Sequence, residues 1–122
     1  MDSITSLAYV PDMPAYAIAN LSNVDLNADI VRYLQEIDDT LVPFGGRFLV
    51  HGVTPEVMEG PWADATVIIE FPDLDRARAR AWYASPAYLE LLPLRTENSD
   101  SAAAILDGVG DGYRAASFLK KL

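Results

Sequence analysis

The strongest strand signal in this chain of 122 residues is Ala65-Thr66-Val67-Ile68-Ile69-Glu70-Phe71. β-Branched and aromatic residues dominate this stretch, as is typical of strands that pack on a half-buried pleated surface. The stretch ends at Pro72-Asp73, where the proline removes a backbone donor and favours a turn. We therefore take this strand as the centre of the fold and extend the interpretation outward from it.

Two strands and a helix are predicted before it. Ala15 to Leu21 alternates as a strand, one face of which carries Tyr16, Ile18 and Asn20. Asn27 is a favourable N-cap for a helix running to about Val42. The apolar residues of this helix recur at helical spacing and are Ile30, Val31, Leu34, Ile37 and Leu41. Proline and glycines at 43–46 end the helix, and Arg47 to His51 predicts the second strand.

Two helices and a last strand are predicted after it. Pro72-Asp73 opens a helix whose apolar residues are Leu74, Ala77, Ala81 and Trp82. Ser85-Pro86 interrupts this helix, and a short second helix follows over Ala87 to Leu92. Ala102 to Leu106 predicts the final strand.

The element order is β-α-β-β-α-β, which predicts an α+β fold of the ferredoxin-like type. In this fold a four-stranded antiparallel sheet carries its helices on one face. A mass of 13.3 kDa leaves room for one domain. We assign residues 1–14 to a lead-in, 15–109 to the domain and 110–122 to a tail.

The helix-free face of the sheet is expected to be apolar, with Ile18, Leu49 and Ile68 on it. Apolar area left in water costs about 25 cal/mol per Å², so we expect this face to pack on a second copy and form a homodimer. We also expect the tail from Tyr113 to pack Phe118 and Leu119 on the partner or on its own core.

Composition excludes several classes of protein. Nine basic against eighteen acidic residues give a net charge of -9, which disfavours nucleic acid and anionic membranes as partners. The chain has no cysteine, which excludes disulfides, thiolate metal sites and a cysteine nucleophile. The first six residues lack the basic and apolar regions of a signal peptide, so we expect a protein of the bacterial cytoplasm.

One candidate polar cluster lies on the predicted strands. Arg47, Leu49 and His51 share one strand face, and Thr66, Ile68 and Glu70 share another, so Arg47, His51 and Glu70 could converge. His51 or Glu70 would act as a general base. The alternative is a set of polar residues at a dimer rim. Antiparallel pairing of the two strands predicts that Glu70 binds Arg47 and leaves His51 free.

Further candidates follow the central strand. Trp82 and Tyr83 are adjacent on a helix, so one is expected to pack in the core while the other lines a groove. Arg95 can clamp a carboxylate or an enol oxygen. These groups could equally fix the corner between the helices. Glu59 lies in a turn-rich loop, where a solvated acid is the alternative.

No cofactor or metal is expected. The sequence has no phosphate-binding loop, nucleotide fingerprint or nucleophile elbow. One histidine and scattered carboxylates give no metal-ligand spacing. Heme would need an axial histidine, for which His51 is the only candidate.

Four motifs occur in order along the chain: Gly45-Gly-Arg-Phe-Leu-Val50, Glu59-Gly-Pro-Trp62, Val67-Ile-Ile-Glu-Phe-Pro72 and Ala81-Trp-Tyr-Ala-Ser-Pro-Ala-Tyr88, with Arg95 later. Together they resemble the bacterial domain-of-unknown-function family numbered 1330, over roughly residues 14 to 109.

The resemblance implies membership of the dimeric α+β barrel superfamily, whose members include cofactor-free monooxygenases, muconolactone isomerases, EthD-like proteins and heme-handling enzymes. It supports the homodimer and supplies no reaction. The candidates that it carries over are Arg47, Glu59, Glu70, Trp82, Tyr83, Ser85, Tyr88 and Arg95. The position of His51 often holds arginine in the family.

Two functions remain open. The first is a cofactor-independent enzyme of isomerase, lyase or monooxygenase type, acting on a small carbonyl or aromatic metabolite in an apolar groove. In it, His51 and Glu70 would be bases, Arg95 an anion clamp, and Arg47, Glu59, Trp82, Tyr83, Ser85 and Tyr88 substrate-binding. The second is a non-catalytic dimeric module, ligand-binding or stress-associated.

Overall fold

The computed structural model describes residues 13–72 and 76–122. Its elements run β1 (Ala15–Ser22), α2 (Ala28–Leu41), η1 (Val42–Phe44), β2 (Arg47–Val50), β3 (Ala65–Phe71), α3 (Arg76–Tyr83), α4 (Pro86–Thr96), β4 (Asp100–Asp107) and η2 (Ala115–Lys121). The lead-in up to residue 12 and the helix start predicted at 73–75 lie outside the described residues.

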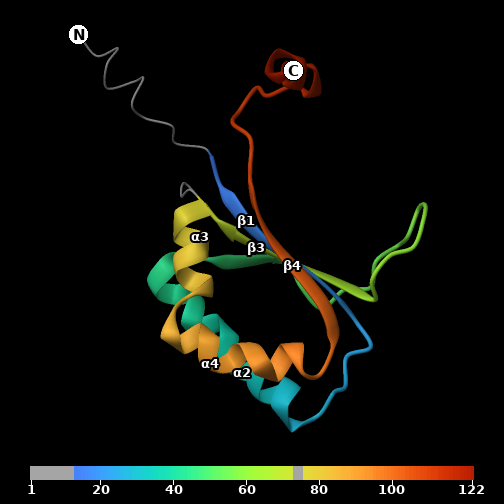
Figure 1. The fold of residues 1–122 in the computed structure, drawn as a ribbon, viewed down its shortest axis with the longest axis vertical. Helices are drawn as coiled ribbons and strands as arrows, with labels where there is room; N and C mark the ends of the chain where they lie inside the picture. The colour runs from blue at the N-terminus through green and yellow to red at the C-terminus, as the bar shows by residue number, and fades with distance from the viewer. Residues whose placement is uncertain (1–12, 73–75) are drawn as a thin grey trace.

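The strands form one antiparallel sheet in the order β2-β3-β1-β4, and helices α2, α3 and α4 cover one face of it (Figure 1). The predicted ferredoxin-like α+β fold is therefore confirmed. Within the described ranges, no helix is both long and apolar enough to span a lipid bilayer.

β1 lies in the middle of the sheet and divides its two faces. Ile18 pairs with Ile68 on β3 and with Ala104 on β4, and these residues belong to the helix-free face. Ala17 pairs with Ile69 and Ile105, which face the helices. The predicted face shared by Tyr16, Ile18 and Asn20 is confirmed.

The second strand departs from the predicted alternation. Arg47 pairs with Glu70 and Phe48 with Ile69, but Val50 pairs with Ile68, so the register shifts between Phe48 and Val50. A β-bulge inserts one residue and reverses the alternation of faces after it. The residue of this strand that lies opposite Ile68 on the helix-free face is therefore Val50, and Leu49, which was predicted to share that face, lies at the bulge.

Helix α2 begins at the predicted N-cap, where the Asn27 side chain accepts a hydrogen bond from the Ile30 amide. Its buried stripe is Ile30, Tyr33, Ile37, Thr40 and Leu41. The prediction placed Val31 and Leu34 on the core side, but both are exposed. Tyr33 takes that position because its hydroxyl finds a partner inside, which removes the cost of burying it.

Helix α4 is longer than predicted and continues through Pro93 to Thr96. Its buried residues, Tyr88, Leu91 and Arg95, recur at spacings of three and four, so burial outweighs the local preference against proline. Arg95 is consequently a helical residue of the last turn. The predicted helix, which ended at Leu92, did not include it.

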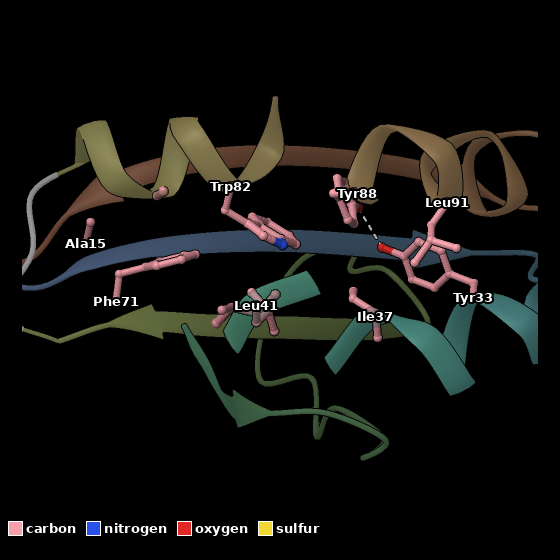
Figure 2. Packing of buried hydrophobic residues seen from close by; sticks show 10 residues of the cluster. Ala15, Tyr33, Ile37, Leu41, Phe71, Trp82, Tyr88 and Leu91 are labelled. Atoms are coloured by element: carbon pink, nitrogen blue, oxygen red, sulfur yellow. Dashed lines mark hydrogen bonds between the residues drawn. The ribbon is translucent and has the colours of Figure 1, made fainter. Parts of the chain in front are cut away.

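The core is a cluster of aromatic side chains between the helices and the sheet (Figure 2). The Trp82 ring lies 5.9 Å from Phe71 and 4.3 Å from Tyr88, measured between centroids. The indole N–H of Trp82 donates to Thr40 Oγ1 over 2.9 Å. This cluster fixes α3 and α4 on the sheet and forms one wall of the cavity described below.

The tail is largely exposed in the single chain. Helix η2 contains no buried residue, and Phe118 and Leu119 are both exposed. Figure 1 shows the tail projecting beyond the end of β4. The packing of these side chains on the core or on a partner therefore stays a prediction.

Candidate functional site

A cavity of about 450 Å³ lies between the helices and the covered face of the sheet. Its walls are apolar, with alanines from β1 and β4, Val67 and Ile69 from β3, and residues of α2. Aromatic rings from four elements also line it, and they are Tyr33, Phe48, Trp82, Tyr83 and Tyr88. A volume of this size is typical of small-molecule sites.

The charged residues that line the cavity all carry one sign. Arg76, Arg80 and Arg95 reach it, and no aspartate or glutamate of the described residues lines it, although Arg76 is paired with Asp107 through bonds of 3.1 and 2.9 Å. The whole chain has a net charge of -9, so the lining is opposite in sign to the rest of the protein. A cavity of this kind attracts anions.

Arg95 is the most deeply buried of these cations, with 5% of its surface exposed. Its Nη1 donates to Ser101 Oγ over 2.7 Å, and no ion pair among the described residues includes it. Burial lowers the pKa of Arg95, but the neighbouring Tyr88 and Tyr33 raise it by more, so the guanidinium stays charged. A buried cation without a carboxylate partner is costly unless an anion joins it.

Two phenols stand beside this guanidinium. The hydroxyls of Tyr33 and Tyr88 are hydrogen-bonded to each other over 2.6 Å (Figure 2), and their rings meet edge to face. Burial raises the pKa of Tyr33 far above its ordinary value of 10.0, helped by Tyr88 and opposed by Arg95. Tyr33 is therefore a neutral hydrogen-bond donor at any physiological pH.

The raised pKa of Tyr33 predicts an alkaline loss of stability. Below pH 10 the phenol of Tyr33 is protonated in both the folded and the unfolded chain. Above pH 10 only the unfolded chain releases this proton, so the free energy of unfolding falls as the pH rises. The slope for one group is about 1.4 kcal/mol per pH unit. Between pH 8 and pH 11, Tyr33→Phe should therefore lose less stability than the unchanged protein. The free energy of unfolding is measured by urea unfolding at each pH. The same decrease with pH in both proteins would contradict this prediction.

The other predicted aromatics do not divide as expected, because both line the cavity. Trp82 is also a buried core residue, whereas Tyr83 is half-buried, with its ring 5.3 Å from that of Tyr88. Ser85 is the N-cap of α4; its hydroxyl donates to the Trp82 carbonyl over 2.6 Å and accepts from the Tyr88 amide. Ser85 does not line the cavity, so its part is to position Tyr88.

The predicted convergence of Arg47, His51 and Glu70 is wrong. The β-bulge turns His51 to the helix-covered side, where its ring lies 5.0 Å from Phe48 and lines the cavity. Glu70 lies on the helix-free face. There its Oε1 accepts from Arg47 Nε over 2.9 Å and from Nη2 over 2.7 Å. The predicted Arg47–Glu70 pair, with His51 free of it, is confirmed.

Loss of this pair is expected to cost more than loss of the histidine. Glu70 is 14% exposed, but Arg47 is 64% exposed, so solvent screening limits the effect to about 1 kcal/mol. Glu70→Gln should therefore lower the melting temperature by a few degrees. His51→Ala, at an exposed ring, should change it less. The opposite order in a thermal melt would contradict the assignment.

Glu59 lies away from this cavity. It lines a second hollow, beside the helix-free face, with Trp62 of the same motif. The Trp62 indole donates to Thr66 Oγ1 over 2.9 Å. Among the described residues, no group of three or more histidine, aspartate or glutamate side chains is placed to hold a metal ion.

Sequence reasoning missed three residues that bring polar groups to the cavity, namely Tyr33, Arg76 and Arg80. Tyr33 was overlooked because the helical period of α2 is also satisfied by Leu34, although the 30-33-37-41 spacing pointed to it. Arg76 and Arg80 were not selected as site residues. Their spacing of four places both on one side of α3, facing the cavity.

The fold and the cavity together define a ferredoxin-like α+β protein with an apolar cavity between its helices and sheet. The chain belongs to the family described as Domain of unknown function (DUF1330), whose model matches residues 14–109. This confirms the family resemblance found in the four motifs. Curated proteins give no match to the chain.

Solved structures with the same fold include three of interest. RPA0582, a protein of unknown function from Rhodopseudomonas palustris, is 17% identical with a TM-score of 0.59, covering 89% of this chain and 94% of that chain. A dimeric ferredoxin-like protein of unknown function from Jannaschia sp. CCS1 is 13% identical with a TM-score of 0.55, covering 76% and 97%. SnoaB, a cofactor-independent oxygenase from Streptomyces nogalater, is 13% identical with a TM-score of 0.50, covering 84% and 99%.

Proposed function

We propose that the cavity binds a small, largely apolar or aromatic molecule that carries a carboxylate or an enolisable carbonyl group. The observation that carries the proposal is Arg95, a buried cation beside the cavity with no carboxylate partner among the described residues. A ligand anion supplies the missing partner, and the guanidinium can bind both of its oxygens. The Tyr33–Tyr88 pair adds neutral donors beside it.

The rest of the cavity sets the ligand's class. Its walls are apolar and aromatic, so the body of the ligand gains from leaving water. Arg80 also lines the cavity, and its positive charge draws an anion in from solvent. A neutral molecule of the same shape would bury Arg95 further without pairing it, and should bind poorly.

The same groups suit proton transfer next to a carbonyl. Arg95 would stabilise the negative oxygen of an enolate, and His51 would take up the proton that is removed. No cofactor enters this scheme, and SnoaB shows that a protein of similar fold, described as a cofactor-independent oxygenase, exists. A non-catalytic module would use the same cavity without the proton transfer.

A thermal-shift series tests the binding proposal. Benzoate, phenylacetate and phenylpyruvate are compared with benzamide and phenylacetamide, which have the same shape without the charge. At 100 times the dissociation constant, a ligand stabilises by about 2.7 kcal/mol, a rise of several degrees. We expect carboxylates to raise the melting temperature and amides to leave it unchanged. Equal shifts for both sets, or none, would contradict the proposal.

Solvent exchange separates the enzyme from the non-catalytic module. In deuterated water, a proton-transfer enzyme speeds the exchange of the methylene protons of bound phenylpyruvate, and His51→Ala slows it. A binding module leaves the exchange rate at its value in buffer. The exchange rate is measured in each case from the decay of the proton NMR signal of the methylene group.

We also propose that the chain forms a homodimer through the helix-free sheet face. Ile18 and Ile68 are paired on this face, on the two central strands β1 and β3. The helices α2, α3 and α4 lie on the other side of the sheet (Figure 1). Apolar sheet faces are stabilised by packing on one another. The Jannaschia protein of similar fold is described as dimeric. Location in the cytoplasm remains a prediction.

Light scattering tests the dimer. At micromolar concentration, we expect a mass of twice 13.3 kDa. Ile68→Asp should reduce it to that of one chain, because a carboxylate would be buried without a partner in the interface. Val31→Asp, on the exposed side of α2, is the matched control and should keep the dimer. A monomer mass for the unchanged protein contradicts the proposal.

A further inference from the structure

The second hollow, of about 430 Å³, lies beside the helix-free face at the long loop between β2 and β3. Val50 and Thr66 belong to it, and their partners on that face are Ile68 and Asn20. Its other walls are mostly exposed apolar side chains and two acids, namely Val53, Glu56, Val57, Met58, Glu59 and Trp62. Neither acid takes part in an ion pair between described residues. The hollow is thus acidic and apolar.

The C-terminal tail has the complementary character. Phe118, Leu119 and Leu122 are exposed on it. Both lysines of the chain, Lys120 and Lys121, belong to it, and Arg114 adds a third cation. The tail lies beyond residue 109, where the match to the family model ends. It therefore combines exposed apolar groups and positive charge in a chain whose net charge is -9.

The tail and the hollow of one chain lie at opposite ends of the sheet. β1 pairs Ala15 with Asp107, where the tail leaves, and Leu21 with Ala65, where the loop of the hollow enters β3. Six residues of strand separate these positions, about 20 Å. Figure 1 shows the tail continuing away from the sheet. In this arrangement the tail of a chain does not reach the hollow of the same chain.

A second copy removes this separation. If two sheets pack face to face about a two-fold axis that crosses the strands, the strands of the copies run in opposite directions. The end of β4 in one copy then lies over the loop end of the other. The two-fold symmetry produces the contact twice.

We propose that in the homodimer the C-terminal tail of each copy docks in the hollow of the other. Phe118 and Leu119 cover the apolar walls around Met58 and Trp62, while Lys120 and Lys121 meet Glu56 and Glu59. Charge complementarity favours this occupant, because the hollow is negative and the tail is the lysine-bearing segment of the chain. The inference rests on the sheet-face homodimer proposed above and is independent of ligand binding in the cavity.

Cross-linking tests the contact directly, because the chain has no native cysteine. One preparation carries Met58→Cys and a second carries Leu119→Cys; they are mixed, exchanged and oxidised. We expect a disulfide-linked pair containing one chain of each kind. Val42→Cys replaces Met58→Cys in the control, since Val42 is also an exposed apolar residue but belongs to η1, on the helix side. Equal cross-linking of control and test overturns the proposal.

Charge exchange gives a second, independent readout. Lys120→Glu with Lys121→Glu should weaken the dimer about tenfold, since like charges then meet. Adding Glu56→Lys and Glu59→Lys should restore it. A chain truncated after Gly110 that dimerises as tightly as the full chain, as measured by sedimentation, overturns the tail contact while leaving the sheet-face dimer intact. A monomeric full chain overturns both.

Discussion

Arg95→Met is expected to weaken the binding of an aromatic carboxylate about 30-fold or more, since losing one partner of a buried charge pair commonly costs about 2–5 kcal/mol. Arg95 is a buried cation of the cavity, and no carboxylate of residues 13–72 or 76–122 forms an ion pair with it. Titration calorimetry with benzoate measures the change. Methionine retains most of the side-chain volume, so the cavity keeps its shape.

The free protein should respond in the opposite direction. Replacing a buried, incompletely paired charge by an apolar side chain is often neutral or stabilising. The melting temperature of the unliganded Arg95→Met variant should therefore stay constant or rise, whereas a misfolded variant would melt lower. Arg32→Met is the control: Arg32 is exposed, binds Glu36 and Glu90, and does not line the cavity. Unchanged affinity in Arg95→Met would contradict the proposed anion site.

Trp82→Ala is expected to destabilise the protein by about 3–5 kcal/mol, which lowers the melting temperature by about 10 °C or more. Trp82 is 2% exposed, and its ring contacts Phe71, Tyr83 and Tyr88. The substitution leaves a cavity in the aromatic cluster and removes the hydrogen bond to Thr40. Urea unfolding measures the change.

Trp62→Ala is the matched control, because it removes the chain's other tryptophan. Trp62 is 57% exposed. In the monomeric chain, its replacement by alanine should change the free energy of unfolding by less than about 1 kcal/mol. The comparison is made at low protein concentration, where a dimer contact at Trp62 contributes little. Equal effects of the two substitutions would contradict the assignment of Trp82 to the core.

The fold could be predicted because its signals are local. The alternation of Ala65–Phe71, the N-cap at Asn27 and the glycines at 45–46 each mark an element or a boundary that the structure retains. Pro93 misled the prediction of α4, since a proline in a helix is locally unfavourable and only the burial of Leu91 and Arg95 compensates for it.

The candidate site was predicted only in part, because it depends on which side of the sheet each residue faces. One bulge after Phe48 moved His51 away from Glu70 and into the cavity. No periodicity reveals a bulge in a strand of four residues. Tyr88, Tyr83 and Arg95 were selected correctly as neighbours, whereas Arg76 and Arg80 required knowledge of how α3 lies on the sheet.

The central claim is that an organic anion binds beside Arg95 in the cavity. The most direct measurement is a titration of ¹⁵N-labelled protein with benzoate, monitored by the indole signals of the two tryptophans and the Nε–H signal of Arg95. Trp82 lines the cavity and Trp62 lines the other hollow. We predict that the Trp82 and Arg95 signals shift together and that Trp62 stays in place, with benzamide moving none. Movement of Trp62 alone, or equal shifts with benzamide, would contradict the claim.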